Sequence, residues 1–245
     1  MNSIQELQKK ERNLLFIDIE TVSAKPNFES LDERLQKLWT RKSGFLQNDN
    51  NLSDAEMYFK RAGIFAEFGK IVAIGMGFFN WEDNVRTLKV KTIANDDEVG
   101  LLNEFKHIIE KKYRPQDLTL CAHNGKEFDF PYLCRRMLVN GIEIPQSLNT
   151  QGRKPWEVLH IDTLEMWKFG DKKHYTSLEL LATIFDIPSS KSDISGEDVN
   201  HVYYNEKSLE RIQSYCSEDI IVLAQLYLKL QSEPLVEEDN IKRIV

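Results

Sequence analysis

Two carboxylic acids interrupt an apolar segment near the start of the chain. Residues 14–21 read Leu-Leu-Phe-Ile-Asp-Ile-Glu-Thr, and an apolar run of this length is typical of a buried β-strand. Because side chains alternate between the two faces of a strand, Asp18 and Glu20 project to one face, while Ile17 and Ile19 point into the core on the other. The segment therefore predicts a buried strand with two carboxylates on a single face.

Neighbouring carboxylates on one face allow two interpretations. Each raises the pKa of the other and costs stability unless a cation neutralises them, and hard oxygen ligands suit Mg²⁺ or Mn²⁺. Alternatively, Asp18 and Glu20 lie at a strand end in contact with water, where their repulsion costs little. The pair alone leaves a metal site and an exposed strand end equally open.

The segments that follow predict an α/β fold with a mixed sheet. Two extended runs, residues 71–79 and 85–90, flank the polar turn 80–84 and are typical of a hairpin. Later strands are expected at 118–122 and 159–162, and helices at 96–109, 131–140, 176–185 and 208–230. Three antiparallel strands followed by alternating helices and strands give a sheet with a parallel half, which requires helices on its faces.

Residues 22–62 interrupt this order as an insertion. They contain leucines at helical spacing, an Asn/Asp-rich loop, and the capping box Ser53-Asp54-Ala55-Glu56, which predicts the start of a second short helix. A lid, a partner-binding surface and a peripheral decoration are all compatible with this segment.

The chain of 245 residues is long enough to bury a full hydrophobic core. We expect one domain over residues 1–245, with a core at about 13–230 and a frayed tail at 233–245. No apolar run approaches the roughly 18 residues that span a bilayer, and the N-terminus lacks a basic-then-apolar export signal. We therefore expect a cytoplasmic protein that does not bind membranes.

The formal net charge of −7 argues against a broad basic surface that grips duplex DNA, since such binding depends on neutralisation of phosphates by Lys and Arg. A role in nucleic-acid chemistry must then act locally, and divalent ions bound to carboxylates would let an acidic pocket accept a phosphate. The three cysteines, Cys121, Cys134 and Cys216, are never spaced as Cys-x-x-Cys, which favours core residues over disulfides or a zinc site.

Two later segments also contain an acid, Asp219 or Asp129, whose position calls for an interaction partner or a structural role. Asp219 follows Tyr215 by one turn on an otherwise apolar helical face, so it requires a buried Arg, a backbone donor or a metal as its partner. Asp129 lies just before Pro131 at the start of a predicted helix, where a simple helix cap would also account for it. His123, at the strand exit before that helix, is expected to be a structural histidine rather than a base.

Three acidic segments therefore occur in a fixed order along the chain. They are Phe16-Ile17-Asp18-Ile19-Glu20-Thr21, His123-Asn124-Gly125-Lys126-Glu127-Phe128-Asp129 and Tyr215-Cys216-Ser217-Glu218-Asp219. Together they resemble the motifs of the DEDD exonucleases, in the subclass whose third motif carries tyrosine. The chain is similar to predicted stand-alone 3'-5' exonucleases related to the proofreading domain of family B DNA polymerases, over residues 13–230.

The resemblance implies a ribonuclease H-like fold and a role for each acid. Asp18, Glu20 and Asp219 would hold a first divalent ion, Asp18 would bridge to a second, and Asp129 would support the second ion directly or through water. Tyr215 would orient the attacking water.

The resemblance also implies substrate contacts. The 3'-terminal nucleotide would lie beside Thr21, and Asn124 and Phe128 are candidate contacts to the strand, although Phe128 fits a place in the core equally well. Asp162 matches no metal motif, so we expect it to be structural. His174 resembles the catalytic histidine of the histidine subclass, but the tyrosine of the third motif argues against that assignment.

These features favour a two-metal 3'-5' exonuclease that uses Mg²⁺ or Mn²⁺ to release nucleoside 5'-monophosphates from the 3' ends of single-stranded DNA. The same carboxylates would serve an exoribonuclease, because discrimination lies in contacts to the 2'-OH. An inactive nucleic-acid-binding module is a third alternative, against which all four acids and Tyr215 argue. A separate polymerase or repair protein could act as a partner, but no segment points to one.

Overall fold

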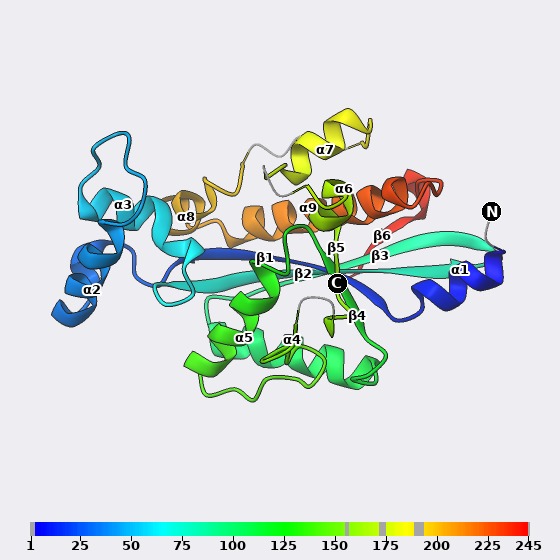
Figure 1. Cartoon of the computed structure of the whole chain (residues 1–245), viewed down its shortest axis with the longest axis horizontal. Helices are drawn as coiled ribbons and strands as arrows, with labels where there is room; N and C mark the ends of the chain where they lie inside the picture. The colour runs from blue at the N-terminus through cyan, green and yellow to red at the C-terminus, as the bar shows by residue number, and fades with distance from the viewer. Residues whose placement is uncertain (1–2, 155–156, 172–174, 189–193, 245) are drawn as a thin grey trace.

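The computed structural model describes residues 3–154, 157–171, 175–188 and 194–244. Within these residues a six-stranded mixed sheet has the order β5-β4-β1-β2-β3-β6 (Figure 1). The strands are β1 (Leu14–Ser23), β2 (Gly69–Glu82), β3 (Val85–Ala94), β4 (Thr119–Ala122), β5 (Ile161–Asp162) and β6 (Ile241–Arg243). Strands β1, β2 and β3 form an antiparallel set, β4 and β5 continue parallel to β1, and β6 runs parallel to β3. The predicted sheet is therefore confirmed, with β6 as an addition.

Helices cover both faces of this sheet. On one face lie α4 (Glu98–Lys112) and α5 (Asp129–Val139); on the other lie α9 (Leu209–Leu230), α6 (Thr163–Lys168) and α7 (Leu178–Ile184) (Figure 1). Leu15, Ile17 and Ile19 pack with α4 and α5 in one hydrophobic cluster, whereas Leu14 and Phe16 pack with α9 in another. The alternation predicted for β1 is confirmed, and it divides the core into two layers.

Local polar residues set the ends of several elements. The β2–β3 hairpin turns at Asp83 and Asn84, whose φ angles of 49° and 65° are left-handed values that Asp and Asn tolerate. Helix α4 begins later than predicted, because the side chain of Asp97, not Asp96, accepts the Val99 N–H. The Asp96 carboxylate instead accepts a hydrogen bond from a distant tyrosine hydroxyl.

The insertion at residues 22–62 folds around a small core of its own. Its elements are η1 (Phe28–Ser30), α2 (Glu33–Ser43), α3 (Asp54–Arg61) and, at its end, η2 (Ala62–Ile64). The short helices against which it docks are α8 (Val199–His201) and η4 (Val202–Glu206). Trp39 is fully buried at the centre, and the predicted capping box opens α3. Asn200 joins the insertion to the body, since its side chain accepts the Ser23 N–H and donates to the Phe59 carbonyl.

The prediction of a frayed tail at 233–245 is wrong for the residues described. After η5 (Glu238–Asn240), β6 pairs with β3, and Val236 is buried. The side chain of Gln225 on α9 donates to the Val236 carbonyl and accepts the Val236 N–H. The partners of the tail lie in β3 and α9, outside the tail itself, so the weakly apolar sequence of the tail gave no indication of this pairing.

The chain also begins with a helix that was not predicted, α1 (Ile4–Glu11), which Ser3 and Glu6 open as a capping box. None of the helices in the described part of the chain is both long and apolar enough to cross a membrane.

Candidate active site

Asp18 and Glu20 lie on the face of β1 that is directed toward α9. Phe16, two residues earlier on that face, packs in the α9 cluster, and Asp18 is paired with Gly75 of β2. The register shifts between Glu20 and Thr21, which marks a β-bulge of the kind that redirects side chains beside functional sites. The two carboxylates therefore share a face, as the spacing predicts.

Helix α9 approaches this face closely because β2 has glycine opposite Asp18. A Cβ atom on Gly75 would lie 2.6 Å from Ile220 Cγ1 and 2.9 Å from Cys216 Sγ. A Cβ on Gly77 would lie 2.5 Å from Ile220 Cγ2. The close approach leaves Cys216 Sγ 3.5 Å from Asp18 Oδ2, so the thiol touches a carboxylate of the site.

Tyr215 and Asp219 complete the α9 side of the site. The Tyr215 hydroxyl donates a hydrogen bond to the Asp219 carboxylate one turn later. Burial raises the pKa of Asp219 to about 6, although this hydrogen bond lowers it. Burial, followed by the negative charges of Asp219 and Glu20, raises the pKa of Tyr215 above its usual value. The phenol is therefore a neutral hydrogen-bonding group among carboxylates.

Asp129 reaches the site from the opposite layer. β4 pairs with β1 only along Leu14–Phe16, which leaves the next part of that strand edge open. Asp129 is the first residue of α5, and its Oδ1 accepts the Ile19 N–H at 3.2 Å. Burial raises the pKa of Asp129 to about 7. Asp129 thus bonds to the backbone between Asp18 and Glu20, which a simple helix cap would not do.

Four carboxylates consequently converge from β1, α5 and α9. Burial raises the pKa of Asp18 well above its usual value, and the negative charges of Asp219 and Asp129 raise it further. The pKa of Glu20 is also raised well above its usual value, first by burial and then by the charges of Asp18 and Asp219. Among the described residues, no Lys, Arg or His forms an ion pair with any of the four. Ligand atoms of Asp18, Glu20 and Cys216 lie within 4.8 Å of one another. Glu20 and Asp129 are buried and Asp18 and Asp219 are half-buried, and carboxylates so placed without a counter-ion fit a divalent cation.

Asp162 holds the loop that leads to Asp129. Its Oδ1 accepts the N–H groups of Asn124 and Leu164, both at 2.9 Å, and its Oδ2 accepts the Lys126 N–H at 3.1 Å. Asn124 has a left-handed φ of 61°, which this tight turn requires and which Asn tolerates. Asp162 therefore has the structural role expected of it.

Tyr175 is a residue of the site that the sequence analysis missed. Nε2 of His123 donates to the Thr176 carbonyl at 2.8 Å, and the His123 ring lies edge-on to the Tyr175 ring with centroids 6.2 Å apart. Burial raises the pKa of Tyr175, and the negative charges of Asp129 and Asp18 raise it further, so the Tyr175 hydroxyl interacts electrostatically with the carboxylates. The residue is nevertheless 63% exposed. Tyr175 belongs to no motif, and only the fold brings it here.

Residues 64–240 match the family described as predicted 3'-5' exonucleases related to the exonuclease domain of PolB. The chain belongs to this family. β1 and the insertion precede the matched segment, so Asp18 and Glu20 lie outside it, whereas Asp129, Tyr215 and Asp219 lie within it.

The fold of this exonuclease agrees with that assignment. The family B DNA polymerase from the hyperthermophilic archaeon Pyrobaculum calidifontis is similar in structure, with a TM-score of 0.53 and 14% identity. The similarity covers 88% of this chain and 24% of the polymerase chain, and it confirms the ribonuclease H-like fold. No curated protein matches the sequence.

The substrate contacts predicted for this exonuclease stay predictions, and the structure shows the surroundings of each residue. Thr21 follows the bulge on β1 and hydrogen-bonds to Tyr132, and Asn124 lies in the turn bound by Asp162. Phe128 packs against the α5 layer with its ring 5.3 Å from that of Tyr132, so it contributes to the core, one of the two roles left open. His174 lies outside the described residues.

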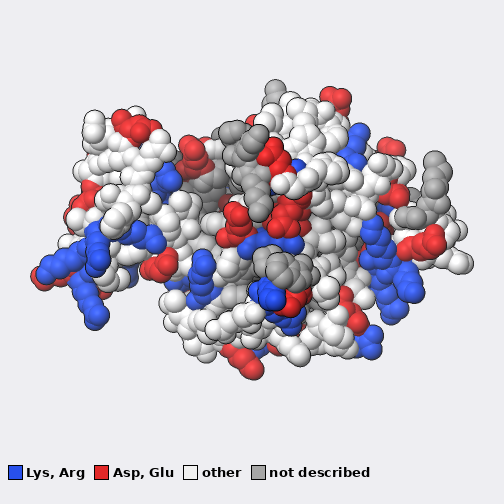
Figure 2. All heavy atoms as spheres, in the orientation of Figure 1, with Lys and Arg blue, Asp and Glu red and all other residues white. Residues whose placement is uncertain are grey.

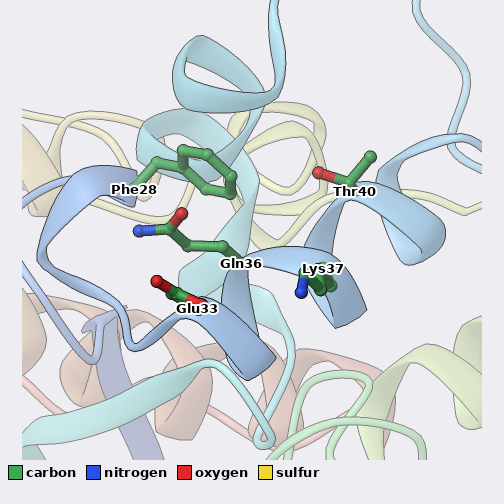
Figure 3. Close-up of a pocket in the computed structure, with 5 residues that line it drawn as sticks. All are labelled: Phe28, Glu33, Gln36, Lys37 and Thr40. Atoms are coloured by element: carbon green, nitrogen blue, oxygen red, sulfur yellow. The ribbon is translucent and has the colours of Figure 1, made fainter.

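A surface hollow of about 480 Å³ lies in the insertion of the exonuclease rather than at the carboxylates (Figure 3). It is lined by Phe28, Glu33, Gln36, Lys37 and Thr40. None of the four converging acids borders it, so the hollow is separate from the candidate active site.

The contact between β2 and α9 can be tested by replacing Gly75 with alanine. The added methyl group would meet Ile220, which is fully buried, so α9 must shift. We expect overpacking to lower the free energy of unfolding by about 1–3 kcal/mol, and kcat to fall because Asp219 moves with α9. Urea denaturation and a nuclease assay measure these effects.

Gly44→Ala is the matched control, because a Cβ there would make only ordinary contacts at 3.6 Å and 3.7 Å. Equal stability and equal kcat for the two variants would contradict the close approach.

Proposed function

We propose that this family member is a two-metal 3'-5' exonuclease that removes nucleoside 5'-monophosphates from the 3' ends of single-stranded DNA. The observation that carries the proposal is the convergence of four carboxylates and a neutral tyrosine, with no ion pair to any of the four carboxylates from a Lys, Arg or His among the residues that the structure describes. A purely structural cluster of this kind would be self-repelling, because like charges cannot all ionise at close range.

The donor set supports Mg²⁺ or Mn²⁺ as the cofactor, since both prefer oxygen ligands. Asp18, Glu20 and Asp219 would hold one ion, with Asp18 shared with a second ion that Asp129 supports. When bound, such ions lower the pKa of water and stabilise negative charge on the attacking and leaving oxygens. The Cys216 thiol against Asp18 Oδ2 would limit that carboxylate to its metal-facing orientation.

The chain's own residues would position the reactants. Tyr215, fixed by its hydrogen bond to Asp219, would orient a water molecule toward the terminal phosphodiester. The water oxygen bonds to phosphorus, the bond from phosphorus to the 3' oxygen of the preceding nucleotide breaks, and that oxygen gains a proton. The products are a nucleoside 5'-monophosphate and a strand shortened by one nucleotide.

The exposed ring of Tyr175, backed by His123, would offer a stacking surface to the terminal base. Thr21 and Asn124 would contact the sugar and phosphate beside it. Stacking of this kind tolerates any base, which suits an enzyme that must remove successive nucleotides of any sequence.

Strands of matched sequence test the proposal. We expect a 5'-labelled single-stranded DNA to give a ladder that shortens by single nucleotides, and a 3'-labelled one to release mononucleotide, only when Mg²⁺ or Mn²⁺ is added. The chelator-treated protein is the control. Cleavage unaffected by chelation, or internal cuts, would refute the proposal. Faster shortening of the matched RNA would replace DNA with RNA as substrate.

A further inference from the structure

One face of α2 is basic and exposed, although the chain as a whole is acidic. Arg34, Lys37, Leu38 and Arg41 are all exposed and lie three or four residues apart along the helix, which places them on one side of it, and Phe45, two residues past the end of α2, is exposed as well. Leu38 is 47% exposed and Phe45 is 83% exposed, so the face combines cations with apolar surface. Figure 2 shows Lys and Arg gathered over α2 at the left end of the molecule.

The three cations on this face have no anionic partner among the residues that the structure describes. Within the described part of the chain, Arg34, Lys37 and Arg41 take part in none of the ion pairs or side-chain hydrogen bonds found. The helix has four cations and a single acid, Glu33, in a chain with a net charge of −7. Cations that are not paired with the acids of their own protein give the surface a local positive charge, which is complementary to a polyanion.

The insertion places this face in a defined position relative to the carboxylates. The chain leaves β1 three residues after Glu20, and η2 packs so tightly on β1 that a Cβ on Gly63 would lie 3.2 Å from Val22. The Tyr132 hydroxyl on α5 donates to the Gly63 carbonyl at 2.7 Å. The insertion therefore ends in η2, which is docked on the same two elements that carry Glu20 and Asp129, and α2 lies at the end of the sheet toward which β1 runs (Figure 1).

We propose that the exposed face of α2 binds the phosphate backbone of the single strand upstream of the 3' end held at the carboxylates. This inference rests on the proposed function. Arg34, Lys37 and Arg41 neutralise phosphates, and Phe45 offers a ring on which an unpaired base stacks. Of the roles left open for the insertion, the structure favours a partner-binding surface whose partner is the substrate strand.

The test is a charge reversal with a matched control. The α2 variant carries Arg34→Glu, Lys37→Glu and Arg41→Glu. The control carries Lys9→Glu, Arg12→Glu and Lys111→Glu, which make the same change in net charge at exposed positions near α1 and on α4. Fluorescence anisotropy with a long single-stranded DNA in the presence of a chelator measures binding without cleavage, and thermal melting confirms that each variant folds.

We expect the α2 variant to bind the strand at least about tenfold more weakly than the control. The slope of log Kd against log salt should decrease by about 2, because each phosphate contact to a single strand contributes roughly 0.7. In hydrolysis, KM for the long strand should rise by a similar factor. Turnover of thymidine 5'-(p-nitrophenyl phosphate), which has no upstream strand, should not change.

Other outcomes overturn the inference. Equal binding by the two variants, or no binding by the wild-type protein, would remove α2 as a strand-binding surface. Tighter binding of the wild-type protein to polyglutamate than to DNA would assign the face to an acidic protein instead. If the wild-type protein hydrolyses neither substrate, the proposed function fails, while the anisotropy comparison still decides the role of α2.

Discussion

Replacing Asp219 with asparagine is expected to lower kcat by at least about 10³-fold. Asparagine keeps the size of the side chain and an oxygen that accepts the Tyr215 hydrogen bond, but it removes one negative charge from the cluster. Metal ions at such sites supply several kcal/mol of transition-state stabilisation, and each 1.36 kcal/mol corresponds to about a factor of ten in rate. Single-turnover cleavage of a 3'-labelled strand at saturating Mg²⁺ measures the loss.

The same substitution should make the metal-free protein more stable, by about 1 kcal/mol. The negative charge of Asp219 raises the pKa of both Asp18 and Glu20. Removing this charge therefore removes a repulsion between carboxylates that destabilises the folded protein. Urea denaturation in the presence of a chelator measures the change, with Asp83→Asn in the exposed hairpin turn as the control. A variant that loses both activity and stability would indicate a structural role for Asp219 instead.

The second large effect is expected outside the carboxylate cluster, at the buried ion pair of Glu98 and Arg136. Arg136 Nε and Nη2 donate to the two Glu98 oxygens at 2.9 Å and 2.6 Å, and Nη1 donates to the Ala66 carbonyl at 2.8 Å. Glu98 also accepts the Ile71 N–H at 2.8 Å, so the pair joins α4, α5 and β2. Arg136→Met leaves Glu98 buried without a cation and should cost about 3–5 kcal/mol of unfolding free energy.

Urea denaturation of a double-mutant cycle separates the charge from the packing. Glu98→Gln in the Arg136→Met background removes the unpaired charge but keeps an acceptor for the Ile71 N–H, so the double variant should regain part of the loss. A cost below about 1 kcal/mol for Arg136→Met would contradict the account. The activity of the folded fraction should be retained, because neither residue contacts the carboxylate cluster.

Periodicity and short polar signals made most of the fold predictable. Alternation along residues 14–21 is a local property of strands, so the direction of Asp18 and Glu20 followed directly. The β2–β3 hairpin and the capping box of α3 depend on neighbouring residues in the same way. The three acidic motifs, each ambiguous alone, resembled one exonuclease family when considered together.

The errors arose where a distant residue decides the outcome. β6 exists because β3 and Gln225 offer partners to a weakly apolar tail. Asp97 rather than Asp96 caps α4, because Tyr203 hydrogen-bonds to Asp96 across the fold. Such contacts leave no period or motif in the segment itself.

The sequence by itself determined that Asp18 and Glu20 share one face of a buried strand, because backbone geometry imposes that alternation on any chain. It could not separate a metal site from a water-exposed strand end. The tertiary structure decided the burial and the charge balance of the pair, while the metal itself stays a prediction. Gly75 lets α9 approach the strand, the open edge of β1 admits Asp129, and no cation among the described residues balances the carboxylates. Burial and charge balance depend on which segments pack together, and that is settled only when the whole chain has folded.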